Sequence, residues 1–142
     1  MLTSARNQLN GKVTSIQRGA VNDEVEIGLA DGQKIVAILT HGSVESLGLQ
    51  TGSEALALIK ASWVILLSDV SGIRLSARNQ LAGTVQEVNT GAVNSEVVLK
   101  LAGGGEIVAI VTNDSVTNLG LAPGKAATAA FKASSVIVGV KA

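Results

Sequence analysis

The chain repeats itself, and this internal repeat constrains its fold more than any other feature. The segment Ser4-Ala5-Arg6-Asn7-Gln8-Leu9 recurs 72 positions later as Ser76-Ala77-Arg78-Asn79-Gln80-Leu81, and the following motifs recur in the same order without a gap. Self-similarity at a constant spacing is the signature of repeated structural units. The 142 residues therefore divide into two tandem domains, which we place at residues 1–70 and 71–142.

Each copy has the hydrophobic pattern of short β-strands. Apolar residues alternate from Val25 to Leu29, and a continuous apolar run extends from Ile35 to Leu39. These patterns predict two strands, with Asp31-Gly32 as the hairpin turn between them. Further strands are expected at Leu9 to Gln17, Ala55 to Ile59 and Val64 to Leu67. About five strands per copy predict an all-β chain, with two tandem OB-like five-stranded β-barrels.

One short helix is expected in each copy, between the third and fourth strands. Ser43 has the residue type of an N-cap, Val44 to Leu47 can form one helical turn, and Gly48 can end it. Barrels of about 70 residues bury a modest fraction of their surface, so we expect them to pack together and to form an oligomer. Exchange of an N-terminal strand between units is left open.

The composition argues against several classes of function. Eleven basic residues balance eleven acidic ones, so no net charge draws the chain toward nucleic acid or anionic lipid. The absence of cysteine excludes a thiolate metal site and a thiol nucleophile. No apolar run approaches the length of a membrane span, and Met1 to Lys12 lacks the pattern of a secretory leader. We therefore expect a cytoplasmic protein without membrane partners.

The acidic residues and the single histidine do not form a recognisable catalytic or metal site. Glu24 and Glu96 are the acids retained in both copies, and one carboxylate per copy forms no acid–base pair, so a cross-strand or capping contact is expected. His41 is replaced by Asn113 in the second copy, which favours a solvated strand end over a metal ligand. We expect no enzyme, and no catalytic residues.

The polar residues that both copies retain are mostly hydrogen-bond donors. They are Ser4, Arg6, Thr40, Ser43 and Lys60 in the first copy and Ser76, Arg78, Thr112, Ser115 and Lys132 in the second. A tetrahedral dianion accepts hydrogen bonds at every oxygen and donates none, so it needs a set of donors and cations without a carboxylate. Thr40 and Ser43 also lie at the predicted helix start, which favours anions. The residues alone leave two interpretations open, an oxyanion site or caps and surface ion pairs.

The order of the motifs resembles that of the molbindin family. The motifs are Ser-Ala-Arg-Asn-Gln-Leu, Gly-x-Val, Gly-Ala-Val-Asn, an Ile-rich strand ending in Thr-x-x-Ser, Leu-Gly-Leu and Lys-Ala-Ser, and they cover nearly the whole chain twice. The resemblance is to the two-domain, tandem Mop/TOBE-like molybdate-binding proteins of the cytoplasm. It implies OB-like barrels, a homotrimer, and storage or homeostasis of molybdate, with tungstate as a second ligand. Related regulators and transport ATPases have additional domains, and we expect this chain to be the binding module alone.

The resemblance also implies where the oxyanions bind. In that family they lie at interfaces, so the serine and arginine of each Ser-Ala-Arg-Asn motif should face the retained threonine, serine and lysine of a neighbouring domain. Axial sites built largely from backbone groups are implied as well. The residues expected there are Ala20, Val21, Asn22, Ala92, Val93 and Asn94. No metal beyond the oxyanion is expected.

Two other functions are not excluded by the sequence. An OB barrel can bind oligonucleotides, although this needs a basic groove and stacking aromatic side chains. Trp63 is replaced by Ser135 in the second copy, so a stacking platform is not repeated, and Trp63 is expected to have a packing role. The other alternative is a structural or regulatory trimer in which Arg and Lys bridge subunits and anions bind incidentally.

Overall fold

The computed structural model describes residues 2–30, 32–69 and 71–142. Asp31, in the expected hairpin turn, and Val70, in the expected join, lie outside these residues. The first copy contains β1 (Asn7–Gln17), β2 (Asn22–Gly28), β3 (Lys34–Thr40), α1 (His41–Leu47), β4 (Glu54–Ile59), the 3₁₀ turn η1 (Ala61–Trp63) and β5 (Ile65–Leu67). The second contains β6 (Asn79–Thr90), β7 (Asn94–Leu101), β8 (Glu106–Thr112), α2 (Asn113–Leu119), β9 (Ala126–Phe131), η2 (Ala133–Ser135) and β10 (Ile137–Gly139).

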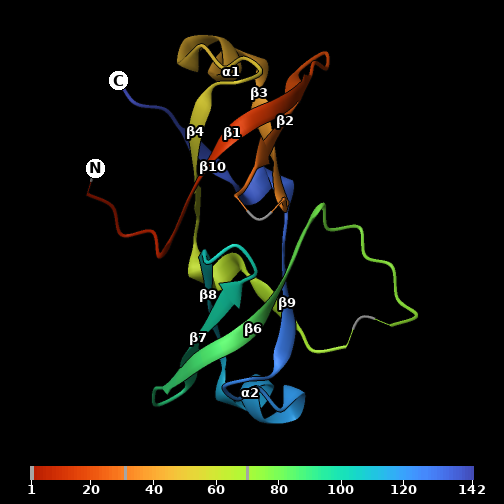
Figure 1. Ribbon diagram of the computed structural model, residues 1–142, viewed down its shortest axis with the longest axis vertical. Helices are drawn as coiled ribbons and strands as arrows, with labels where there is room; N and C mark the ends of the chain where they lie inside the picture. The colour runs from red at the N-terminus through yellow and green to blue at the C-terminus, as the bar shows by residue number, and fades with distance from the viewer. Residues whose placement is uncertain (1, 31, 70) are drawn as a thin grey trace.

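These strands form two five-stranded antiparallel sheets, so the predicted all-β fold with one short helix per copy is confirmed. Figure 1 shows the sheets one above the other, with α1 at the upper end and α2 at the lower end. In the described ranges, no helix is long and apolar enough to cross a membrane.

The two sheets exchange their last strands. The sheet orders are β10-β4-β1-β2-β3 and β5-β9-β6-β7-β8, so each sheet contains one strand of the other copy. Figure 1 shows β10, in dark blue, beside β4 of the first copy. Within the chain it is the last strand of each copy that is exchanged, because the 3₁₀ turn after β4 or β9 redirects the chain into the other sheet, whereas β1 pairs with β2 and β4 of its own copy. The division of the repeat at residue 70 stays a prediction.

The exchanged strands add to a hydrophobic core that includes residues of both sheets. The alternation of β2 buries Val25 and Ile27 completely, as the sequence predicts. Leu66 of β5 and Val138 of β10 are buried against the sheets of the other copy, and both belong to the same core cluster. Each copy therefore needs the other to complete its own sheet and core.

The asparagine of each Ser-Ala-Arg-Asn motif joins the two copies. The Asn79 amide is fully buried, donates from Nδ2 to the Val36 carbonyl of β3 at 2.8 Å, and accepts from the Val36 N–H at 2.7 Å. Asn7 makes the same two bonds to Val108 of β8, at 2.8 and 2.6 Å. Because β3 and β8 are edge strands, each amide takes the place of a further strand residue.

The helix start differs from the sequence-based prediction. Thr40, not Ser43, is the N-cap of α1, with extended backbone and an Oγ1 that accepts from the Ser43 N–H at 3.1 Å. The reason is that β3 leads directly into α1, which places Ser43 in the first helical turn. Gly48 ends the helix in the left-handed region at φ 64°, as predicted.

Candidate functional site

Three of the predicted ligands meet in a pocket where the two copies contact each other. Ser76, Arg78 and Lys132 line this pocket of about 470 Å³ together with Ile38 of β3 and Ile65 of β5. Lys132 lies there because η2 packs against β3 of the first copy. The pocket is called the inter-copy pocket below.

Ser134 contributes an additional hydroxyl to the inter-copy pocket and is not among the ligands predicted from the sequence. It follows Lys132 by two residues, and the 3₁₀ turn η2 between β9 and β10 carries it into the lining. Its counterpart in the first copy is Ser62. The repeated Lys-Ala-Ser motif was the signal that could have identified both serines.

The corresponding residues of the first copy are Ser4, Arg6 and Lys60, and η1, which follows Lys60, packs against β8 as η2 packs against β3. Arg6 lines a different pocket of about 420 Å³, with Leu29 of the first copy and Leu101 of the second. The Nζ atom of Lys60 lies 5.7 Å from the centroid of the Trp63 ring, a cation–π contact. Ser4 is exposed near the N-terminus. The cation–π contact has no counterpart in the second copy, where Ser135 takes the place of Trp63.

Trp63 is not packed in the core, so its expected packing role is wrong. Its exposed fraction is 47%, whereas Ala61 and Val64 on either side are buried. Ala61 is the residue of the 3₁₀ turn that faces the core, with an exposed fraction of 4%. Trp63 therefore points outward, where its ring contacts Lys60.

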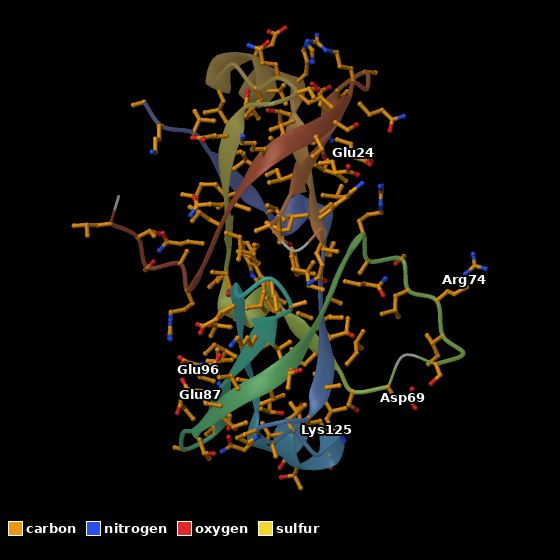
Figure 2. All side chains as sticks on the ribbon, in the orientation of Figure 1. Glu24, Asp69, Arg74, Glu87, Glu96 and Lys125 are labelled. Carbon is orange, nitrogen blue, oxygen red and sulfur yellow. The ribbon has the colours of Figure 1, made fainter. Side chains whose placement is uncertain are left out.

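Both motif arginines pair with a carboxylate of the other copy. Arg78 donates from Nη1 and Nη2 to the two carboxylate oxygens of Glu24, at 2.8 and 2.6 Å. Arg6 forms an ion pair with Glu96. Glu24 lies in the upper half and Glu96 in the lower half of Figure 2. Glu96 also accepts from Asn89, its partner in register on β6, at 3.4 Å, so the expected cross-strand contact is confirmed for Glu96. The ion pairs between the copies were not expected from the sequence.

The electrostatic effect of these pairs is the same in both copies. The hydrogen bonds from Arg78 hold the pKa of Glu24 below its ordinary value, against the opposing effect of burial. Hydrogen bonding by Arg6 likewise lowers the pKa of Glu96. Glu24 and Glu96 are therefore ionised at neutral pH, and each compensates part of the positive charge of its arginine.

The predicted hydroxyl ligands on the helices lie at the two ends of the molecule. The Oγ atoms of Thr40 and Ser43 are 2.8 Å apart, as are those of Thr112 and Ser115. In the part of the chain that the structure describes, none of these four lines the inter-copy pocket. One chain thus brings Ser76, Arg78 and Lys132 of the second copy together, whereas Thr112 and Ser115 lie at the end of the molecule.

The residues of the expected axial sites lie beside the helix starts. Asn22 is in register with Thr40, and the Val21 carbonyl accepts from the His41 N–H at 3.0 Å. Val93 and Asn113 make the equivalent bond at 2.9 Å. The Gly-Ala-Val-Asn turn needs its glycine, because a Cβ at Gly19 would come within 2.3 Å of the Asn22 carbonyl oxygen. Ala20 to Asn22 and Ala92 to Asn94 are all exposed.

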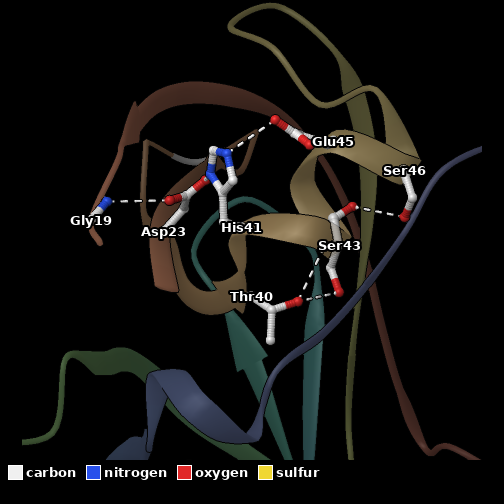
Figure 3. A network of polar contacts seen from close by, with 7 residues as sticks. All are labelled: Gly19, Asp23, Thr40, His41, Ser43, Glu45 and Ser46. Carbon is white, nitrogen blue, oxygen red and sulfur yellow. Dashed lines mark hydrogen bonds and ion pairs between the residues drawn. The ribbon is translucent and has the colours of Figure 1, made fainter. Parts of the chain in front are cut away.

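His41 is part of a polar network at one end of the first copy (Figure 3). Its Nδ1 lies 2.9 Å from the buried carboxylate of Asp23, and its Nε2 lies 3.0 Å from Glu45. Asp23 also accepts from the Gly19 N–H at 3.2 Å. His41 thus lies at the end of β3 with a side chain that is 37% exposed, as expected, but the sequence did not predict its ion-pair network. Elsewhere among the described residues, as here, no group of His, Cys, Asp and Glu is arranged to hold a metal ion.

This network contains two perturbed ionisable groups. The hydrogen bond and negative charge of Asp23 raise the pKa of His41. Burial acts to raise the pKa of Asp23, but the hydrogen bonds from His41 and Gly19 outweigh it, so the pKa is lowered. In the second copy a neutral pair, Ser95 and Asn113, occupies these positions and is joined by a hydrogen bond. The two ends of the molecule therefore differ in charge.

Comparisons with known proteins agree with the repeat. The family model described as the TOBE domain matches residues 3–66 and 75–138. The molybdenum transport protein ModE of Herbaspirillum seropedicae is 49% identical over 99% of this chain and 52% of its own length. The molybdenum-pterin-binding protein MopA of Rhodobacter capsulatus is 47% identical over 97% of this chain and 52% of its own. The chain thus spans about half the length of the curated relatives it matches.

A solved structure matches along the whole chain. It is the cytoplasmic molybdate-binding protein ModG in a form with molybdate bound, at 52% identity and a TM-score of 0.97, covering 99% of this chain and 100% of that one. The family resemblance inferred from the motifs is confirmed by this match and by the two family matches. The chain belongs to the TOBE domain family and carries two copies of that domain in tandem.

Proposed function

We propose that this chain binds and stores molybdate, with tungstate as a second ligand, at oxyanion sites where its copies and neighbouring chains meet. The observation that carries the proposal is the inter-copy pocket, which brings Ser76, Arg78 and Lys132 together. The structure of ModG, described as cytoplasmic, contains molybdate and matches this chain throughout. We propose the same ligand and the same location for this protein.

The chemistry of the inter-copy pocket suits a tetrahedral dianion. Arg78 and Lys132 supply two positive charges, and the hydroxyls of Ser76 and Ser134 can donate further hydrogen bonds. Ile38 provides an apolar wall, which lowers the local dielectric constant and strengthens these interactions. These residues do not include a nucleophile with a neighbouring base, so the proposal is binding without catalysis.

The remaining predicted ligands are proposed to act between chains. Exposed apolar side chains such as Ile65 (61%) and Ile137 (59%) offer surface for association, in support of a homotrimer. In that assembly another chain supplies further donors to each interface site, and the axial sites form where three Gly-Ala-Val-Asn turns meet. The residues concerned are Ser4, Arg6, Thr40, Ser43, Lys60, Thr112 and Ser115 for the interface sites and Ala20, Val21, Asn22, Ala92, Val93 and Asn94 for the axial sites.

Native mass spectrometry with and without molybdate tests this proposal, because it reports assembly size and bound ions together. We expect a trimer with about two ions per chain at interface sites, and a few more per trimer on the axis. A monomer that binds molybdate with full affinity would contradict the interface sites. No bound molybdate at micromolar concentration would contradict the function itself.

The double variant Lys60→Ala/Lys132→Ala tests the ligand assignment. We expect a loss of about 2–5 kcal/mol of binding free energy per site, because the dianion loses a cation in a partly desolvated site. Lys12→Ala is the matched control, since Lys12 is exposed on β1 and is replaced by Thr84 in the second copy. Affinities of the double variant within a factor of about two of the wild type would exclude these lysines as ligands.

A further inference from the structure

Glu24 and Glu96 have the same relation to a motif arginine in both copies. Each lies on the second strand of its copy and pairs with the arginine of the other copy. We propose that Glu24 and Glu96 are positioning residues of the oxyanion sites, which hold the guanidinium groups of Arg78 and Arg6 so that their remaining N–H groups can bind the anion. This inference rests on the proposed function and adds residues to it.

The pairing with Glu24 leaves Arg78 able to bind a ligand. A guanidinium group carries five N–H donors. Glu24 accepts from one on Nη1 and one on Nη2, so three remain. Arg78 also lines the inter-copy pocket with Ser76 and Lys132. The arginine can therefore bind the carboxylate and an anion in the pocket at the same time.

Both ends of the Arg78 side chain are held by the first copy. The next residue, Asn79, fixes the backbone through its two buried hydrogen bonds to Val36. Glu24 is anchored within β2, in register with Ile38, which is itself part of the pocket lining. Without Glu24 the guanidinium would be a half-exposed group on a flexible stem, and ordering it would oppose anion binding.

The negative charge of Glu24 acts in the opposite direction. Arg78 and Lys132 supply two positive charges to the pocket, and Glu24 reduces the local net charge to one, which disfavours a dianion. In the proposal the ordering of the guanidinium outweighs this repulsion, because the carboxylate is bound to the guanidinium and does not itself line the pocket. Variants that separate the hydrogen bond from the charge can distinguish the two effects.

The test is isothermal titration of molybdate, and of sulfate in competition, into the full-length protein. For Glu24→Ala/Glu96→Ala we expect molybdate affinity to fall about tenfold, and its preference over sulfate to narrow, because a mobile arginine adapts to the smaller ion. Glu24→Gln/Glu96→Gln keeps an acceptor and should retain affinity within about threefold of the wild type. Glu24→Asp/Glu96→Asp keeps the negative charge, but its shorter side chain draws the carboxylate away from the arginine. This variant should bind molybdate more weakly than the wild type.

Glu26→Ala is the matched control. Glu26 lies two residues further along β2 and bonds Thr14 and Lys34 of its own copy. This variant should keep both affinity and selectivity. Thermal melting and native mass verify folding and assembly in each variant, and the Asp and Gln pairs decide the question if the Ala pair does not fold.

Unchanged or tighter molybdate binding by the folded Ala or Asp variants would overturn the positioning role. A lower melting temperature with unchanged affinity and selectivity would also overturn it, since the pairs would then only join the copies. Failure of the wild-type protein to bind molybdate is a different outcome, which would refute the proposed function.

Discussion

The side-chain amides of Asn7 and Asn79 are buried polar groups that lie between the two copies. Their exposed fractions are 1% and 0%, and each replaces a missing backbone partner on an edge strand. A buried backbone group without a partner costs more than an average hydrogen bond contributes. These two residues therefore specify that the two copies pack against each other in one register.

Replacing Asn79 by Ala should destabilise the protein considerably. The N–H and C=O of Val36 would lose their partner, at about 1–3 kcal/mol for each group. Urea denaturation of Asn79→Ala measures the loss in the free energy of unfolding. Asn118→Ala, an exposed position on α2, should change it by less than about 0.5 kcal/mol. Equal effects of the two changes would show that the amide does not join the copies.

His41 should make the stability of the protein depend on pH near neutrality. Its pKa is raised above the ordinary value of about 6.5 by the hydrogen bond and charge of Asp23. A raised pKa means that the folded state binds the proton more tightly. The stabilisation is therefore fully present below about pH 6.5 and is lost as the pH rises through the raised pKa.

The variant His41→Asn introduces the residue that the second copy has at Asn113. Thermal or urea unfolding between about pH 6 and 9 should show a decline in wild-type stability that this variant lacks. The decline comes from the first copy alone, since the pair of Ser95 and Asn113 does not titrate there. Parallel profiles for the two proteins would rule out His41 as the source.

At the scale of secondary structure, the exchanged strands β5 and β10 determine which parts of the chain depend on each other. β10 pairs with β4 through Ile137, Val138 and Gly139, although the two strands belong to different copies. The C-terminus of the chain therefore completes the sheet that its N-terminus begins. Loss of β10 should therefore destabilise the sheet of the first copy before that of the second.

Deleting residues 137–142 tests this dependence. Hydrogen exchange should accelerate at Leu56 to Leu58 of β4, because β4 loses its partner β10, keeps only β1 and becomes an edge strand. β9 keeps its partner β5 and should remain protected to a similar extent. If exchange accelerated at β9 and not at β4, the strands would be paired within their own copies.

At the scale of the whole molecule, neither copy is structurally complete alone. Residues 1–70 lack β10, and residues 71–142 lack β5. Without the exchanged strand each sheet would expose an unpaired edge and part of the core at Leu66 or Val138. Because both copies belong to one chain, each supplies the last strand of the other's sheet at any protein concentration.

A chain of residues 1–70 should therefore depend on association. We expect it to form dimers or larger assemblies in which two copies exchange strands, and to unfold on dilution to the monomer. Light scattering combined with circular dichroism over a dilution series measures both. A stable folded monomer of this half would show that strand exchange is dispensable.

Much of the fold was predictable from local patterns. Alternation identified β2 with its buried Val25 and Ile27, and Gly48 correctly marked the end of the helix. The helix start was misassigned because both Thr40 and Ser43 have cap-forming side chains, and only the end of β3 decides between them. Trp63 was misassigned because hydrophobicity does not show which side chain of a tight turn faces inward.

For the candidate site, the donor residues could be named from the sequence, but their partners could not. The repeat identified Arg78 and Lys132, which do line one pocket. It also showed that Glu24 and Glu96 are retained, yet equivalence between copies does not reveal that each acid meets the arginine of the other copy. Sequence spacing orders residues along a strand, whereas such contacts depend on how two sheets pack.

By itself the sequence determined what each segment of this protein forms, because strand alternation and helix ends depend on residues near one another in the chain. Only the tertiary structure decided which copy supplies the last strand of each sheet. Backbone hydrogen bonds are chemically the same whether β4 pairs with β5 or with β10, so the strand sequences do not distinguish the two arrangements. The choice follows from the path of the chain through η1 and η2 and from the burial of Asn7 and Asn79 between the copies.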